Sequence, residues 1–279
     1  MRLRAVILGC GSSGGVPRIG GVDGRGDWGD CDPGEPRNYR SRCSIAIQRA
    51  RADGSFDGRL TTVLIDCAPE MRLQLIENGI HTVDAAVFTH DHADQTHGID
   101  DLRVVALQRM ERVPVYASSH TAPDLFARFS YCFERKPGSS YPAVLDWHEL
   151  PADGAQFEVD GPTGPVPVIP FLQKHGRVPS HGFRCGPIAY SSDLHDLEEE
   201  SWRVVDGCEA WIIDALQYRP HGSHLHLDKA LAFLERARAR RGILTNLHVV
   251  MDYRTVASET PEHVEPAYDG MVIETHPVA

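Results

Sequence analysis

The sequence predicts an α/β fold with a large share of sheet. Short apolar runs rich in β-branched residues recur along the chain, and segments of helical character lie between some of them. The 279 residues contain no low-complexity linker, so we expect one domain with a large core, residues 1–279. The predicted strands, mostly bounded by turn-forming residues, are 5–9, 43–48, 61–66, 85–90, 113–118, 187–193, 210–215, 242–248 and 271–274.

Four segments are predicted to be helices: residues 69–79, 100–110, 122–133 and 228–242. The last has Asp228 near its start and basic residues with Gly242 at its end, as capping and the helix dipole favour. The acidic run 195–202 is expected to open a further helix for the same reason. Residues 15–42 and 151–181 are expected to be irregular, and such long loops in a compact domain are often functional.

Five of the apolar runs finish in a histidine or a carboxylate. One such residue is commonly a turn former, but five strand ends collected along one edge of a sheet would gather their side chains. The pattern therefore favours a polar site at that edge. The five residues are Asp66, His90, Asp193, Asp214 and His248.

The stretch HDHADQ, residues 90–95, predicts a metal site. His90 and His92 are two positions apart just beyond a predicted strand, so both can point the same way in an extended turn. Asp94 follows at once and can reach a second ion from the same loop. Imidazole nitrogen combined with carboxylate oxygen suits Zn²⁺, Mn²⁺ or Fe better than Mg²⁺ or Ca²⁺.

The charge of the chain disfavours a nucleic-acid partner. Lys and Arg number 28 against 39 Asp and Glu, which gives a net charge of −11. This balance opposes a broad contact with a phosphate backbone, but it is compatible with a small phosphorylated substrate bound through metal.

Cysteine usage and hydropathy predict a cytoplasmic protein that does not enter the membrane. The seven cysteines are odd in number and form no C-x-x-C pair, as expected for reduced thiols. The apolar run near the N-terminus is too short for a signal peptide, and no stretch approaches membrane-spanning length. A homodimer is left open by the sequence.

These residues resemble the metallo-β-lactamase superfamily, whose signature H-x-H-x-D-H matches at every fixed position but the last. The resemblance extends to LGCGSSGGVP, LIDCAPEMR, GIDDLR, QKHG, YSSD, HGSHLHLDKAL and LTNLHVVMDY. It is strongest to the phosphodiesterases that open phosphoribosyl 1,2-cyclic phosphate, with the tRNA 3′ processing endonucleases as the next branch. It implies an αββα sandwich with a dinuclear metal site at one edge.

The resemblance also implies a role for individual residues. His90, His92 and His175 would hold a first ion, Asp94 and His248 a second, and Asp193 would bridge the two. Asp66 would orient the ligands, and His224 would assist the leaving group. Two features depart from the pattern: Gln95 replaces a histidine of the second site, and the clustered cysteines of a structural zinc site are missing, since Cys31 and Cys43 stand alone.

The reaction expected from these roles is hydrolysis of a phosphodiester. A water acidified by the metal would attack phosphorus, with Asp94 among the catalytic ligands, and His224 would protonate the departing oxygen. The expected cofactor is one or two ions of Zn or Mn, with Fe as a third candidate and the second site weakened at Gln95. Contacts with the substrate are predicted for Ser12, Ser13, His221 and Arg103, although Arg103 could instead pair with Asp100.

Two other functions are left open by the sequence. tRNA 3′ processing needs a basic arm, whereas the Gly- and Pro-rich residues 151–170 contain no Lys or Arg. A binding module that keeps one metal but little turnover is the other alternative, and Gln95 is its only direct support.

Overall fold

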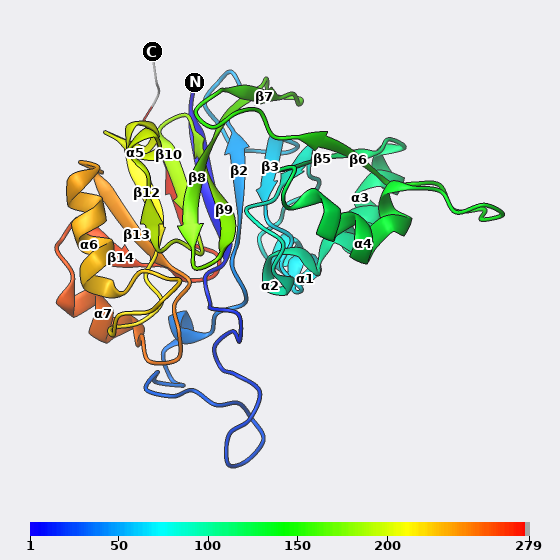
Figure 1. Ribbon diagram of the computed structural model, residues 1–279. Coiled ribbons are helices and arrows are strands. Elements are labelled where there is room, and N and C mark those ends of the chain that lie inside the picture. The colour runs from blue at the N-terminus through cyan, green and yellow to red at the C-terminus, as the bar shows by residue number, and fades with distance from the viewer. Residues whose placement is uncertain (277–279) are drawn as a thin grey trace.

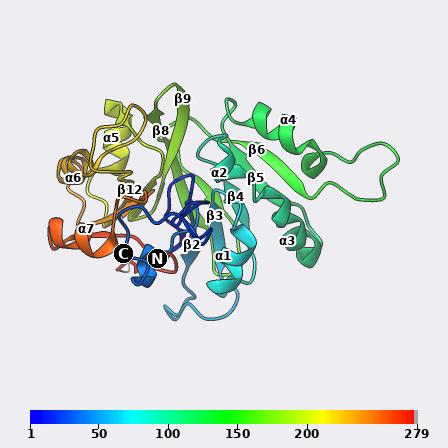
Figure 2. The same cartoon turned by 90° about the horizontal axis from the view of Figure 1, so that it is seen from below.

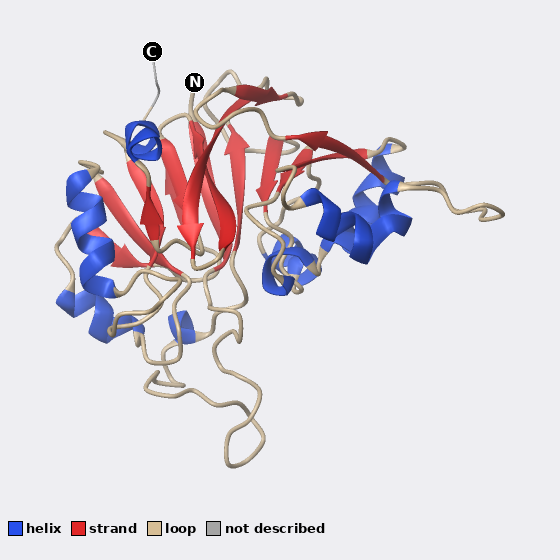
Figure 3. Ribbon diagram, in the orientation of Figure 1, coloured by secondary structure: helices blue, strands red, loops and turns tan. Residues whose placement is uncertain are grey.

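The computed structural model describes residues 1–276, and its strands form two sheets with helices on their outer sides (Figure 1, Figure 3). This arrangement confirms the predicted α/β class and the αββα sandwich. The last three residues of the predicted domain 1–279 lie outside the described residues. Among the described residues, no helix combines the length and the hydropathy needed to cross a membrane.

The first sheet joins the N-terminal strands to the last strand of the chain. The strands at 3–9, 44–49 and 272–274 are antiparallel to their neighbours, and the strand at 61–65 begins a parallel run that continues through 85–87, 113–117 and 145–149. In spatial order the strands are β15 (Val272–Glu274), β1 (Leu3–Gly9), β2 (Ser44–Arg49), β3 (Thr61–Ile65), β4 (Ala85–Val87), β5 (Val113–Ala117) and β6 (Leu145–Glu149).

The second sheet combines an antiparallel part with a parallel part. The strands at 166–175, 178–185 and 188–191 form an antiparallel meander, and the last of them runs parallel to the strands at 210–214, 241–245 and 264–266. In spatial order the strands are β11 (Asp196–Leu197), β8 (Val166–His175), β9 (Val178–Cys185), β10 (Ile188–Ser191), β12 (Ala210–Asp214), β13 (Arg241–Thr245) and β14 (Val264–Pro266), with β7 (Phe157–Val159) paired to β8.

Helices cover the outer face of each sheet, as the view from below makes clear (Figure 2). On the first sheet lie α1 (Met71–Glu77), α2 (Ala93–Thr96), α3 (Leu102–Arg109) and α4 (Ala122–Phe133). On the second lie α5 (Glu199–Val205), α6 (Leu227–Arg236) and α7 (Tyr253–Glu259). Short 3₁₀ turns occupy Pro36–Asn38 and Ile99–Asp101. The predicted helices and the helix at the acidic run are thereby confirmed.

The core fills the space between the sheets and the space under each helical layer. One cluster joins Ile45 and Ile65 of the first sheet to Phe183 and Ile212 of the second. Two further clusters lie between the sheets and their helices. Central strands such as β3 are therefore buried on both faces, which explains why they read as continuous apolar runs rather than as an alternating pattern.

The prediction that residues 151–181 are irregular is wrong, because β7, β8 and part of β9 lie there. The prolines of β8 suggested a loop, since proline cannot donate to a sheet ladder. In the structure Pro167 pairs only with β7 and Pro170 only with β9, so each has one side without a neighbouring strand. A proline whose nitrogen faces such a free side costs no ladder hydrogen bond. The long loop at 15–42 is confirmed (blue, below the sheets in Figure 1).

Candidate metal centre

The predicted strand-end residues meet at one edge of the sandwich. Asp66 and His90 follow the parallel strands β3 and β4, and Asp193 and His248 follow the parallel strands β10 and β13. Parallel strands present their carboxyl ends at the same edge, so the side chains converge. A cavity of about 370 Å³ opens here, lined by Ser12, Ser13, Arg18, His92, Asp94, His175, Asp193, Leu216, Gln217, His221, Ser223, His224, Asn246 and His248.

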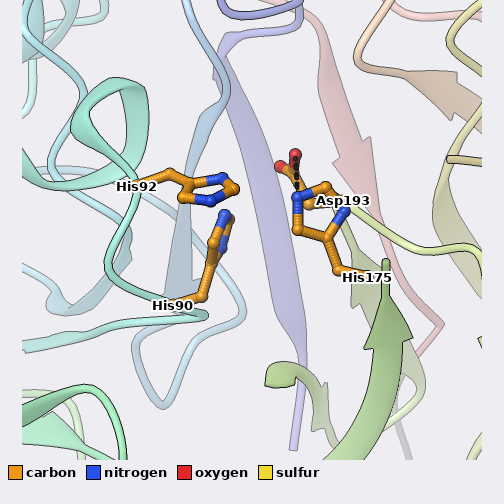
Figure 4. A group of neighbouring side chains, drawn as sticks. All are labelled: His90, His92, His175 and Asp193. Atoms are coloured by element: carbon orange, nitrogen blue, oxygen red, sulfur yellow. Dashed lines mark ion pairs between the residues drawn. The ribbon is translucent and has the colours of Figure 1, made fainter. Parts of the chain in front are cut away.

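Four side chains in this region face one another: His90, His92, His175 and Asp193 (Figure 4). Each contributes one possible ligand atom, and these atoms all lie within 4.8 Å of one another. The centroids of the three imidazole rings are 4.4 to 5.1 Å apart. The structure thus brings together the predicted ligands of the first ion.

A hydrogen-bond chain from Asp66 sets the tautomer of His90. The Thr89 hydroxyl donates to Asp66 Oδ2 at 2.9 Å, and it lies 2.9 Å from His90 Nδ1. Because its proton is directed at Asp66, the hydroxyl accepts from Nδ1–H, and the lone pair of His90 is left on Nε2. That Nε2 atom is buried and has no hydrogen-bond partner. Asp66 therefore lies behind His90, where it was expected, and its contact with the ring runs through Thr89, a residue that no sequence signal singled out.

His175 presents its Nε2 in the same way. Its Nδ1 lies 2.8 Å from the carbonyl oxygen of Ser223, which can only accept, so Nδ1 carries the proton. The bare Nε2 lies 3.7 Å from Asp193 Oδ1. Burial lowers the pKa of His175 to about 4 and that of His90 well below its usual range, so both rings are neutral near pH 7.

Buried electron-pair donors that face one another need a cation between them. Bare imidazole nitrogens and the Asp193 carboxylate, which is 4% exposed, form such a set. Three imidazoles with one carboxylate suit a divalent transition metal. The residues of the first site therefore fit the group that the fold implies.

The second site does not form in the same way. Among the described residues, Asp94 and His248 line the cavity but do not join a group of ligand atoms within reach of one ion. Gln95 Nε2 donates to Asp193 Oδ2 at 3.1 Å and to Asp94 Oδ2 at 3.4 Å, while its Oε1 is buried without a partner. The amide thus presents its donor, not its possible ligand atom, to the two carboxylates.

His224 is held as a cation beside the cluster. Its Nδ1 lies 2.8 Å from Asp214 Oδ2, and its Nε2 lies 3.8 Å from Asp193 Oδ1. Burial lowers the pKa of His224, but the hydrogen bond to Asp214 and the charges of Asp214, Asp193 and Asp94 raise it to about 9. The ring therefore carries a proton at neutral pH, as a general acid requires.

Asp214 was recognised in the sequence as one of the strand-ending acids, yet its function was not. It accepts from His224, from the backbone N–H of Leu194 at 3.0 Å and from Asn246 Nδ2 at 3.3 Å. These contacts fix both His224 and the turn that carries Asp193. Burial raises the pKa of Asp214, although the hydrogen bond with His224 opposes this effect.

The strand ends at the site use a rare backbone conformation. Asp66, Asp193 and Asn246 have φ values of 63°, 50° and 62°. Asp and Asn tolerate this left-handed region better than other residues with a side chain. Such conformations concentrate at functional sites, where the surrounding structure over-determines them. The sharp turn after each strand directs the polar side chain into the centre.

The predicted substrate contacts are only partly gathered here. Ser12, Ser13 and His221 line the cavity, as expected. Arg103 does not; its Nη2 lies 2.7 Å from Asp100 Oδ1, so the alternative pairing is the correct one. Arg18 lines the cavity but was missed, and its only sequence signal was a basic residue shortly after the loop that carries the two serines.

The comparisons with known proteins define the class to which this fold and site belong. A family model described as the beta-lactamase superfamily domain matches residues 61–246. A solved structure described as a new diphosphatase from the PhnP family is 30% identical, with a TM-score of 0.82 over 99% of this chain and 98% of that chain. The chain belongs to this superfamily, in its metallo-β-lactamase branch, and it is a metal-binding hydrolase by class.

More distant structures share the fold. Zn²⁺-bound PqqB from Methylobacterium extorquens is 17% identical, with a TM-score of 0.68 over 97% of this chain and 99% of that chain. The short form of human tRNase Z is 17% identical, with a TM-score of 0.61 over 99% of this chain and 100% of that chain.

One curated relative matches at the level of sequence. An octanoyltransferase from Porphyromonas gingivalis is 29% identical over 271 residues, or 96% of this chain. The chain spans about half the length of that relative, 51%.

Removal of the Thr89 hydroxyl should weaken the first metal site. In Thr89→Val the Nδ1–H of His90 loses its acceptor, so we expect metal affinity to fall by about ten- to a hundred-fold, as for other partners of ligand histidines. Competition with a chelator measures this loss. Thr89→Ser should keep parental affinity, and Thr62→Val, which removes a buried hydroxyl of β3 away from the site, is the matched control. Parental affinity in Thr89→Val would contradict the role of the chain from Asp66.

Gln95→His should strengthen the second site, which is expected to be weak in the parent. The substitution removes the amide donor from the two carboxylates and adds an imidazole, so second-ion affinity should rise by about ten- to a hundred-fold. Metal analysis of protein purified without chelators should give one tight ion in the parent and two in the variant. Gln95→Ala separates loss of the amide from gain of the ligand. Two equally tight ions in the parent would show that Gln95 is a tolerated ligand.

Proposed function

We propose that the protein is a metal-dependent phosphodiesterase that acts on a small cyclic sugar phosphate or a nucleotide-like substrate, of the phosphoribosyl 1,2-cyclic phosphate type. The observation that carries this proposal is the position of His224, whose Nδ1 lies 2.8 Å from Asp214 and whose Nε2 lies 3.8 Å from Asp193 at the edge of the four-donor cluster. A proton donor beside a metal-ligand set is what cleavage of an ester with a poor leaving group needs. The resemblance at 30% identity to a protein described as a diphosphatase also supports it.

His90, His92, His175 and Asp193 would hold a divalent ion, Zn²⁺ or Mn²⁺, with Fe as a third candidate. When bound, such an ion acidifies water and offsets negative charge on the phosphoryl oxygens. Thr89 and the Ser223 carbonyl keep the two buried imidazoles in the tautomer that ligation requires. The second ion is proposed to be weak or labile, because Gln95 donates to Asp94 and Asp193.

His224 supplies the proton for the leaving oxygen. Asp214 accepts from Nδ1–H, so the acidic proton on Nε2 faces the cavity. After the P–O bond breaks, the oxygen of the departing sugar takes this proton, and Asp214 keeps the neutral ring in place. The cavity of about 370 Å³ has room for a small phosphorylated substrate.

The other candidate functions have less support. Residues 151–170, the segment weighed as an arm for tRNA, contain no Lys or Arg, and they include β7 and the first half of β8. The likeness to tRNase Z at 17% identity supports the fold alone. The name octanoyltransferase belongs to a protein of which this chain matches half, so it supports no activity here.

His224→Gln should separate substrates by their leaving groups. We expect the metal-loaded protein to hydrolyse both phosphoribosyl 1,2-cyclic phosphate and bis(p-nitrophenyl) phosphate. His224→Gln should slow the first by about 10²- to 10⁴-fold, since a sugar oxygen needs a proton, and should slow the second much less, since nitrophenolate leaves unprotonated. Steady-state kinetics measure both rates. His226→Gln, two positions away and outside the cavity lining, is the matched control.

Three outcomes would overturn the proposal. Equal losses on both substrates would remove His224 from the role of general acid. Tight binding of sugar phosphates without product in a phosphorus NMR time course would favour the binding module. Salt-sensitive binding of precursor tRNA at submicromolar protein would favour the endonuclease.

A further inference from the structure

Arg18 is an arginine without a partner in the wall of the cavity. It is the only Lys or Arg among the lining residues, and its guanidinium makes no hydrogen bond or ion pair with any residue of the described chain. Other arginines near the loop do have partners: Arg37 and Arg254 both bind Glu35. A free guanidinium in a hollow lined with two carboxylates is available to a ligand.

The loop that carries Arg18 is fixed at its base. Arg18 and Asp27 exchange two backbone hydrogen bonds, each 2.9 Å long, and Val16 and Arg40 form a second such pair. Val16 also packs with Cys31 and Val249, which follows His248 in the chain. The position of the Arg18 backbone relative to His248 is therefore set by packing rather than by the exposed tip of the loop.

The side chain of Arg18 is seated on Gly14. A Cβ at Gly14 would lie 3.1 Å from Arg18 Nε and 3.2 Å from its Cγ, so the glycine leaves the room in which the arginine lies. The same turn carries Ser12, which is 3% exposed and whose hydroxyl is buried without a hydrogen-bond partner. The loop therefore brings two residues with unpaired hydrogen-bond donors, the cationic Arg18 and the neutral Ser12, to the same cavity.

We infer that Arg18 and Ser12 form a subsite for a second phosphoryl group of the substrate, distinct from the group that reacts at the metal ligands. A planar guanidinium can bind two phosphoryl oxygens at once, and a hydroxyl adds a third donor. The substrate class is therefore one with two phosphoryl groups, either as a diphosphate or as a sugar with a separate phosphomonoester. This inference rests on the proposed function for the identity of the reacting group.

Binding without turnover tests the subsite first. Calorimetry on the metal-loaded protein should show that Arg18→Gln lowers the affinity for inorganic pyrophosphate by about ten- to a hundred-fold, because charge-assisted hydrogen bonds are lost. The affinity for inorganic phosphate should be nearly unchanged. Arg18→Lys should lie between, since it keeps the charge but not the fork. The matched control is Arg25→Gln, which removes an exposed arginine of the same loop that does not line the cavity.

Kinetics then distinguish the source of the second phosphoryl group. Arg18→Gln should lower kcat/KM by about ten-fold or more for the substrate class that uses the subsite, and by a smaller factor for bis(p-nitrophenyl) phosphate, which carries no second phosphoryl group. Two substrates are compared: phosphoribosyl 1,2-cyclic phosphate, which carries a separate phosphomonoester, and a nucleoside diphosphate sugar, which carries a diphosphate. The substrate whose kcat/KM falls more identifies the source of the second phosphoryl group.

The inference and the proposed function fail in different ways. Equal pyrophosphate affinity in the parent and Arg18→Gln, or an equal loss in Arg25→Gln, overturns the subsite even if diesters are hydrolysed. A selective pyrophosphate defect without turnover of any diester supports the subsite and overturns the phosphodiesterase. Unchanged melting temperatures confirm that each variant is folded.

Discussion

The site depends on a group of electron-pair donors that face one another, of which His90, His175 and Asp193 are buried and His92 is partly exposed. His90, His92, His175 and Asp193 point at one another where the two sheets meet, and the first ring has an Nε2 without any partner. A buried polar atom left unpaired costs free energy, and a buried carboxylate costs more. A divalent ion bound between these side chains would offset this cost, so metal binding would stabilise the surrounding structure.

The architecture supplies the rigidity that such an arrangement needs. Parallel strands in each sheet bring their carboxyl ends to one edge, and left-handed turns after β3, β10 and β13 redirect the chain there. Behind the ligands, Thr89 connects His90 to Asp66, and Asp214 connects the Asp193 turn to His224. A site built on strand ends and supported from behind is held more accurately than one built on free loops.

Much of the fold and of the ligand set could be predicted from the sequence. The apolar runs marked the central strands, and HDHADQ marked His90 and His92, because both signals are local. His175 needed the family resemblance, since it ends β8, a strand whose prolines made the segment read as a loop. Nothing local distinguishes Pro170 in a ladder from Pro170 in a loop; the free side of β8 is a property of the assembled sheet.

The supporting residues could not be predicted because their roles exist only across the fold. Asp214 and His224 are ten positions apart, yet their hydrogen bond requires β12 and the following loop to be in place. The sequence shows that Gln95 replaces a histidine, but not that its amide donates to two carboxylates. Arg18 is remote from the metal motif in sequence and enters the cavity only through the loop packed on Val249.

The most direct test of the account is a crystal structure of the protein grown with Mn²⁺ or Zn²⁺, with anomalous diffraction measured on either side of the metal absorption edge. We expect one strong anomalous peak among His90 Nε2, His92, His175 Nε2 and Asp193, at ligand distances of about 2.0 to 2.2 Å. The absence of a peak there, or a full-height peak only between Asp94 and His248, would contradict it.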